Sequence, residues 1–221
     1  MKTFLLWLNE NELLQNVGKL KLIKAEIANI VPLSDVEVKI LLNDFDNSYF
    51  GIRNKLMVML MLDSGLRRGE VVNLESKNIF MHNNTMLVQG KGEKERLVPF
   101  GEETKRYINR YSHMRNEYEK RFFQKEDGTP ITDNTIKMYF QDLKESTGII
   151  RLHPHLLRHT FATNYILYGG DVEELRILLG HTSLQMTMKY VHLATQQRIL
   201  NQRYHSHIDK LFCQYDNKLA Q

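Results

Sequence analysis

Five side chains from three separate segments have the types needed to move a phosphoryl group: Tyr190, Arg67, Arg158, His155 and His181. A phosphodiester is anionic and gains charge on its oxygens during attack, so the planar, permanently charged guanidiniums of arginine suit it as a clamp. His155 precedes Arg158 by three residues, about one helical turn, so both side chains can face one phosphate. A tyrosine hydroxyl has a pKa of about 10 and needs nearby cations to attack as a phenolate. The set predicts covalent phosphoryl transfer to Tyr190.

Two further residues have types that would support this chemistry. Glu70 follows Arg67 by three residues and is expected to position that guanidinium without reacting itself. Lys91 lies between two glycines of a predicted hairpin, where it is expected to enter a groove and protonate a departing oxygen as general acid. Lys94 is a nearby alternative for that role. Because a phosphotyrosine keeps the energy of the broken bond, neither ATP nor a metal ion is required.

The segments that contain these residues resemble, in order, the four sequence boxes of the tyrosine recombinase, or phage integrase, family. They are the arginine box Gly65–Glu70, the lysine hairpin Gly90–Arg96, the His-x-x-Arg box His155–Thr163, and the terminal box Leu179–Ser183 with Tyr190. The resemblance implies a site-specific recombinase or integrase that acts on double-stranded DNA through a 3′-phosphotyrosine, with no cofactor. It also implies that His155 assists proton transfer and that His181 donates to a non-bridging oxygen.

Basic residues around the boxes are expected to contact DNA phosphates, which gives salt-dependent and largely sequence-neutral affinity. These residues are Lys94, Arg96, Lys137 and Lys144, with Arg68 as a further candidate. The segment after Gln196 resembles the family's C-terminal segment, which implies packing on a neighbouring protomer.

Individual residues also have plainer interpretations. Arg67 and Glu70 taken alone are typical of an exposed helical ion pair, and the hairpin lysine is typical of a solvated turn. Zinc binding by His153, His155 and His159 is rejected, because no glutamate follows in the metalloprotease pattern and no cysteine is near. His159 is expected to be structural, with its ring toward the core.

Two other activities are weighed against recombination. A type IB-like topoisomerase uses the same chemistry to relax supercoils, and a recombinase-derived regulator would bind DNA without cutting it. The Gly-Leu-Arg and Leu-Gly-His sequences favour the recombinase, and the presence of every expected reactive residue argues against the regulator.

Composition is compatible with this interpretation. The 221 residues include 42% hydrophobic and 25% charged residues, as in ordinary globular proteins, and the net charge of +4 permits a polyanionic partner. Cys213 is the single cysteine, so an intrachain disulfide and a Cys-rich metal site are excluded. The start is too short for a signal sequence or a membrane span, so a soluble, cytoplasmic protein without membrane association is expected.

The elements that must position these residues predict a mainly helical α+β fold with a small three-stranded antiparallel sheet. Residues 1–31 are expected to form a helix and a basic linker left from a DNA-binding domain, and residues 32–221 the catalytic domain with its C-terminal helix. The apolar run 56–62 predicts a buried helix, with a buried strand as the alternative. Strands are expected at 79–81, 85–89 and 95–98, and helices from the capping box 34–37, over 102–123, around 136–143, and after 154, 171, 183 and 196.

Overall fold

The computed structural model describes residues 7, 11, 30–90 and 94–201 of the chain. The chain divides into two compact units, residues 1–31 and 32–221. The predicted N-terminal helix and basic linker fall mostly outside the described residues, so that prediction is not tested. The second unit contains all of the helices and strands that follow.

The first two helices of this unit begin where the sequence predicts. Helix α2 (Asp35–Asn43) starts at a complete capping box, in which the Ser34 side chain accepts from the Glu37 backbone and Glu37 accepts from the Ser34 backbone. Helix α3 (Tyr49–Asp63) is buried on nearly all sides over 56–61, which confirms the helix over the alternative strand. Gly65 follows it with φ +64°, a conformation that favours glycine.

A small sheet follows the short helix α4 (Arg68–Asn73) and the 3₁₀ turn η1 (Ser76–Asn78). Strands β1 (Ile79–Phe80), β2 (Thr85–Gln89) and β3 (Glu95–Pro99) pair antiparallel in the order β1-β2-β3, so the described part of the chain contains the predicted three-stranded sheet. The register places Val88 opposite Arg96. The end of β2 and the start of β3 therefore flank the hairpin that carries Lys91.

The helix predicted over 102–123 is wrong in its second half. Helix α5 (Glu102–Ser112) ends at Ser112, and the chain then folds back as a loop. The Arg115 guanidinium holds this loop by donating to the backbone carbonyls of Glu119, Arg121 and Phe122. Phe122 is thus buried by a loop, whereas Met114 and Tyr118, which share the helical spacing, are exposed. Helix α6 (Asp133–Thr147) then covers the predicted positions 136–143.

Three helices complete the unit: α7 (Pro154–Leu167), α8 (Val172–Leu179) and α9 (Gln185–Asn201). The first two begin where Pro154 and Asp171 predict, and Gly180 ends α8 with φ +60°. The prediction of a separate helix from Gln196 is wrong, because α9 continues through that position to Asn201.

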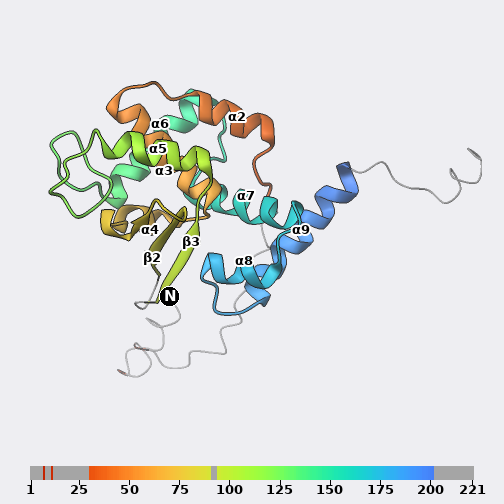
Figure 1. Ribbon diagram of the computed structural model, residues 1–221. Coiled ribbons are helices and arrows are strands. Elements are labelled where there is room, and N and C mark those ends of the chain that lie inside the picture. Colours follow the sequence, from red (N-terminus) through yellow and green to blue (C-terminus); the bar gives the residue numbers. More distant parts are fainter. Residues whose placement is uncertain (1–6, 8–10, 12–29, 91–93, 202–221) are drawn as a thin grey trace, which may run out of the picture. The chain divides into compact units, whose positions relative to one another are not determined.

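Helix α7 joins two apolar cores among the described residues. The larger core is built on α3 and includes side chains from α5, α6 and the sheet. A smaller one is shared by α7, α8 and α9 and contains Ala162, Leu175, Leu179 and Tyr190. In Figure 1, α7 accordingly lies between α3 on one side and α8 and α9 on the other. No helix within 30–90 and 94–201 is long and apolar enough to cross a membrane.

Gly65 offers a test of how tightly α7 packs on the end of α3. A Cβ at Gly65 would lie 2.4 Å from the Phe161 ring, whereas one at Gly148, which has φ +70°, would meet nothing within 4 Å. We expect Gly148→Ala to lower the free energy of unfolding by about 1–2 kcal/mol, the strain of a left-handed residue. Gly65→Ala should cost about 1–3 kcal/mol more, from overpacking. Urea unfolding measures both, and equal losses would contradict this packing.

Candidate active site

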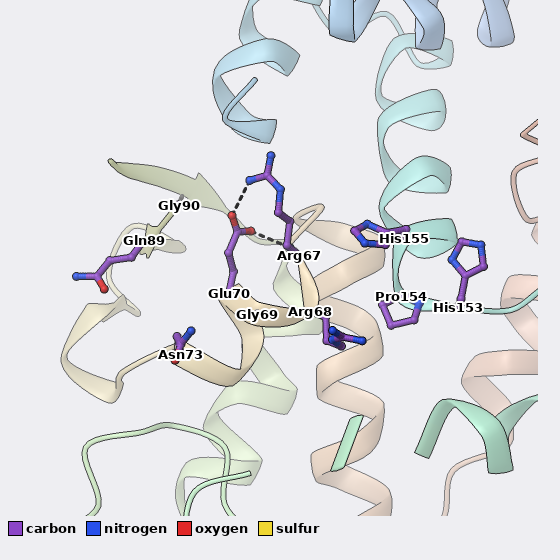
Figure 2. A pocket seen from close by; sticks show the side chains of 10 residues that line it. All are labelled: Arg67, Arg68, Gly69, Glu70, Asn73, Gln89, Gly90, His153, Pro154 and His155. Atoms are coloured by element: carbon purple, nitrogen blue, oxygen red, sulfur yellow. Dashed lines mark hydrogen bonds and ion pairs between the residues drawn. The ribbon is translucent and has the colours of Figure 1, made fainter. Parts of the chain in front are cut away.

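A cavity of about 500 Å³ opens where α4, the end of β2 and the start of α7 meet. Its lining includes Arg67 and Glu70 from the α4 segment, Gly90 after β2, and His155 from α7. Figure 2 shows the Glu70 carboxylate directed toward Arg67, with His155 across the cavity on α7. The structure thus brings residues from three predicted boxes to one site.

Glu70 is the centre of an ion-pair network that joins three elements. Its Oε1 accepts from Arg67 Nη1 at 2.8 Å and from Arg96 Nη1 at 2.8 Å, and its Oε2 accepts from Arg96 Nη2 at 2.9 Å. Arg158 Nη1 lies 3.9 Å from Oε2. Glu70 Oε2 also accepts from the Arg67 backbone N–H at 2.7 Å, which fixes the turn that begins α4. The predicted positioning role of Glu70 therefore has a direct geometric basis.

The charge balance of this network suits an anion. The Glu70 side chain is 4% exposed, and although burial alone would raise the pKa of its carboxyl, the hydrogen bonds and charge of Arg96 keep that pKa below its ordinary value. One carboxylate faces the guanidiniums of Arg67, Arg96 and Arg158, which leaves an excess of two positive charges. This excess lies beside an open cavity, where a phosphate could approach it.

Arg96, predicted to contact DNA phosphate, is buried in this structure and is paired with Glu70. Its side chain is 8% exposed, and it donates to both oxygens of Glu70 and, at 2.6 Å, to the Leu178 carbonyl. These bonds occupy the guanidinium and bury it. Through these hydrogen bonds Arg96, on β3, links that strand to Glu70 on α4 and to Leu178 at the end of α8.

Arg158 is held by backbone carbonyls rather than by an acidic partner alone. Its Nη1 donates to the Gly65 carbonyl at 2.6 Å, and its Nη2 donates to the Leu179 carbonyl. Burial, and then the charge of Arg67, lower the pKa of Arg158 to about 9, so the group stays mostly charged at neutral pH. The turns after α3 and α8 thus fix its direction.

Tyr190 lies on α9 with 1% of its surface exposed. Its hydroxyl is hydrogen-bonded to Nδ1 of His159 at 2.8 Å, and the His181 ring lies parallel to its own with a centroid distance of 6.3 Å. Burial raises the pKa of Tyr190 to about 12, against the opposing charges of Arg158 and Arg67. The hydroxyl is therefore protonated and shielded from solvent in this structure.

His159, which is expected to be structural, makes this contact from α7. His159 is only partly buried, and its ring meets the Tyr190 hydroxyl, because it lies on the face of α7 that packs against α9. Burial, and then the charge of Lys189, lower its pKa to about 4, so the imidazole is neutral at pH 7. The signal in the sequence was its position one turn after His155.

The remaining histidines have different partners. His181 Nδ1 is 2.9 Å from Thr187 Oγ1, and burial followed by the charge of Arg158 lowers its pKa to about 4. His155 is exposed at the cavity, and burial of part of its ring, followed by the charge of His153, lowers its pKa. His153 caps α7 by accepting from the Leu156 backbone at 3.0 Å.

The lysines predicted to act in the site are placed less directly. Lys91 lies outside the described residues, although Gly90, its neighbour, lines the cavity. Lys94 and Lys137 are exposed and Lys144 is half-buried. Arg68, considered as a further DNA contact, pairs with Asp133 at 3.0 Å.

Comparison with known proteins shows the family. The model of the phage integrase family matches residues 32–197, most of the chain. The chain belongs to the phage integrase family. Tyrosine recombinase XerC of Staphylococcus epidermidis is 37% identical over 155 residues, which cover 66% of this chain and 51% of that protein. XerC of Staphylococcus haemolyticus is 35% identical over 152 residues. This phage integrase family chain therefore spans about half the length of these curated relatives.

Solved structures of the same type agree with the fold. XerA recombinase has a TM-score of 0.68 at 29% identity, over 79% of this chain and 66% of that one. The catalytic domain of bacteriophage HP1 integrase has a TM-score of 0.57 at 24% identity, over 78% of this chain and 95% of that one. The mainly helical fold with a small antiparallel sheet is thus that of a phage integrase family catalytic domain.

The network at Glu70 predicts a large cost for losing the carboxylate. Glu70→Ala leaves buried guanidiniums without their partner, which should lower the free energy of unfolding by about 3–5 kcal/mol. Glu173→Ala, which removes an exposed pair with Arg176, is the control and should cost much less. Urea unfolding measures both. A loss at Glu70 no larger than at Glu173 would contradict the network.

The same network predicts a pH dependence. Because the pKa of folded Glu70 lies below its ordinary value of 4.5, its ionisation stabilises the fold above that pH, and this contribution is lost as pH falls. The difference in unfolding free energy between wild type and Glu70→Gln should therefore shrink below pH 4.5. A difference that stays constant or grows on acidification would argue against it.

Proposed function

We propose that this chain is the catalytic part of a site-specific DNA recombinase that cleaves and rejoins strands through a 3′-phosphotyrosine at Tyr190. The observation that supports it most is the position of Arg67 and Arg158. Both are held beside Glu70, and both have charges that act on the Tyr190 hydroxyl. Two fixed guanidiniums near a tyrosine hydroxyl are the arrangement that attack on a phosphodiester requires.

In the proposed reaction, Arg67 and Arg158 bind the non-bridging oxygens of one phosphate. Tyr190 Oη attacks phosphorus, and the bond from phosphorus to the 5′ oxygen breaks. Lys91 protonates that oxygen as it leaves, and His181 donates to a non-bridging oxygen. His155, at the cavity, assists proton transfer. A 5′ hydroxyl then attacks the phosphotyrosine and restores the DNA, so no step uses ATP or a metal ion.

DNA must reach a tyrosine that is 1% exposed. A shielded hydroxyl cannot contact a phosphate without movement, so we propose that DNA binding displaces the Tyr190 region of α9 from its place against α7. The first turn of α9 contains no acidic residue, and Lys189 lies with its amine 4.8 Å from the Tyr190 ring centre. The positive charge of Lys189 in this segment favours the approach of DNA phosphates.

We further propose the parts that the described residues do not test. Residues 1–31 are the end of a preceding DNA-binding domain, because the family match begins at residue 32 and the match to the curated relatives covers only about half of their length. Self-association on DNA uses the end of α9, where Ile199 and Leu200 are exposed aliphatic side chains. DNA as partner and a single cysteine favour the cytoplasm. The likeness to XerC, XerA recombinase and HP1 integrase favours recombination over topoisomerase activity.

Replacing the nucleophile gives the first test. The full chain is incubated with a pool of nicked duplexes of randomised sequence, in which cleavage near the nick releases a short strand and traps the covalent product. Wild type should form a denaturation-resistant adduct. Tyr190→Phe should abolish the adduct and retain DNA binding, because only the hydroxyl is removed.

Tyr168→Phe is the matched control, since Tyr168 is an exposed tyrosine at the end of α7, and it should form the adduct normally. Absence of any adduct with wild type across the pool and across salt concentrations would reject the enzymatic proposal. An adduct that survives Tyr190→Phe would mean that another residue is the nucleophile.

The phosphate contacts proposed for α6 are tested by salt dependence. Lys137 and Lys144 are seven residues apart on α6, so they lie on one face of the helix. Replacing both by alanine should reduce the slope of log affinity against log salt by about 0.9 for each phosphate that the variant no longer neutralises. Lys39→Ala on α2 is the control. An unchanged slope in the double variant would remove α6 from the DNA interface.

A further inference from the structure

The acceptor capacity of the Glu70 carboxylate is shared between two arginines. A carboxylate offers about four lone pairs to hydrogen-bond donors. Arg96 takes one on each oxygen, through Nη1 at 2.8 Å and Nη2 at 2.9 Å. Arg67 takes the other two, through Nη1 at 2.8 Å and its backbone N–H at 2.7 Å, and Figure 2 shows both of these bonds. The Arg67 side chain therefore has a single bond to Glu70.

Arg67 accordingly keeps most of its donors for another partner. A guanidinium has more N–H groups than one carboxylate oxygen can accept. Apart from the bond of Nη1, the Arg67 side chain makes one long contact among the described residues, 3.4 Å from Nη2 to the Gly180 carbonyl. The Arg67 side chain is 33% exposed and lines the cavity, whereas that of Arg96 is 8% exposed and does not line it. The donors of Arg67 thus lie beside the space that a phosphate would occupy.

A second partner fixes the direction of the Arg96 guanidinium. Its Nε donates to the Leu178 carbonyl at 2.6 Å, which leaves the edge formed by Nη1 and Nη2 for Glu70. The turn after α8 can lie against this side chain because residue 180 is a glycine. A Cβ at Gly180 would be 3.3 Å from Arg96 Cδ, tighter than an ordinary contact. Arg96 is therefore held in place against both oxygens of Glu70.

We propose that Arg96 is a positioning residue of the reaction: by pairing with both oxygens of Glu70, it keeps the donors of Arg67 free for the phosphate that is cleaved. The inference rests on the proposed function. Two parallel charge-assisted bonds are a favoured geometry between a guanidinium and a carboxylate. Without Arg96, the Arg67 side chain would pair with Glu70 in this way and turn its donors from the cavity. Arg96 lies outside the cavity lining, so its effect passes through Arg67.

Arg96→Lys separates the paired geometry from the charge. An ammonium is a point charge without the planar fork of a guanidinium, so this variant keeps the charge of the network but leaves acceptor capacity on Glu70 open. Arg96→Gln, which has neither the fork nor the charge, is a second variant. Arg151→Lys is the matched control, because Arg151 pairs with both oxygens of Glu37, at 2.6 and 2.8 Å, outside the cavity lining. Thermal unfolding confirms that each variant is folded.

Single-turnover adduct formation is measured at saturating concentrations of a duplex that forms the adduct. We expect Arg96→Lys to be slower than wild type by roughly 100-fold, the usual effect of losing one donor to a developing anion. Its DNA affinity should change little, and Arg151→Lys should react at the wild-type rate. A loss below about tenfold for Arg96→Lys would overturn the inference, because charge at position 96 would then be sufficient.

A double-substitution cycle tests whether the effect passes through Arg67. In an Arg67→Lys background no guanidinium at position 67 can pair with both oxygens of Glu70. Adding Arg96→Lys to this background should therefore slow the reaction further by less than about threefold. The same loss of roughly 100-fold in both backgrounds would show independent effects and a merely structural role for Arg96, which would overturn the inference.

Crystal structures of wild type and Arg96→Lys give a test that needs no activity. We expect the Arg67 side chain to donate to both oxygens of Glu70 in the variant, in place of its single bond in wild type. A variant in which Arg67 keeps the single bond would overturn the inference. If wild type forms no adduct on any duplex, the proposed function fails, and the arrangement of Arg67 in the two crystal structures still decides whether Arg96 positions it.

Discussion

The buried carboxylate of Glu70 is the constraint on which the site depends. It lies among the guanidiniums of Arg67, Arg96 and Arg158, which come from the start of α4, from β3 and from α7. Isolated cations would not remain buried together, because each loses hydration and repels the others. The single carboxylate of Glu70 makes it possible to bury the three guanidiniums together, but it leaves the network with a net positive charge. The site therefore has the fold and the electrostatic excess to receive a phosphate in the ligand-free protein.

The proposed nucleophile, Tyr190, is held separately from the arginines around Glu70. The Arg158 side chain is held by backbone carbonyls in the turns after α3 and α8. Tyr190 instead lies in the apolar core shared by α7, α8 and α9. Burial keeps the hydroxyl protonated, and His159 engages it. In the proposed reaction a complete clamp thus faces a tyrosine that is inactive until DNA binding moves it. This separation would protect the cell from cleavage by a protein that has found no site.

Local signals in the sequence were enough to predict most elements and much of the site. The Ser34 capping box, the glycines after α3 and α8 and the alternating strands are short-range features that the structure follows. The loop after Ser112 was missed because Tyr111 and Phe122 have helical spacing but are buried by a fold-back that Arg115 holds. The burial of Arg96 was not predicted because its charge suggests exposure, and its partner Glu70 lies 26 residues away. Only tertiary contacts could show that His159 meets Tyr190.

The chemical identity of the trapped adduct tests the role of Tyr190 most sharply. The covalent complex is digested with a protease and a nuclease, and the remaining nucleotide is located by tandem mass spectrometry. We predict one modified peptide, with a 3′-phosphodeoxynucleotide on Tyr190. A nucleotide on any other residue, or one joined through its 5′ phosphate, would contradict the proposed mechanism.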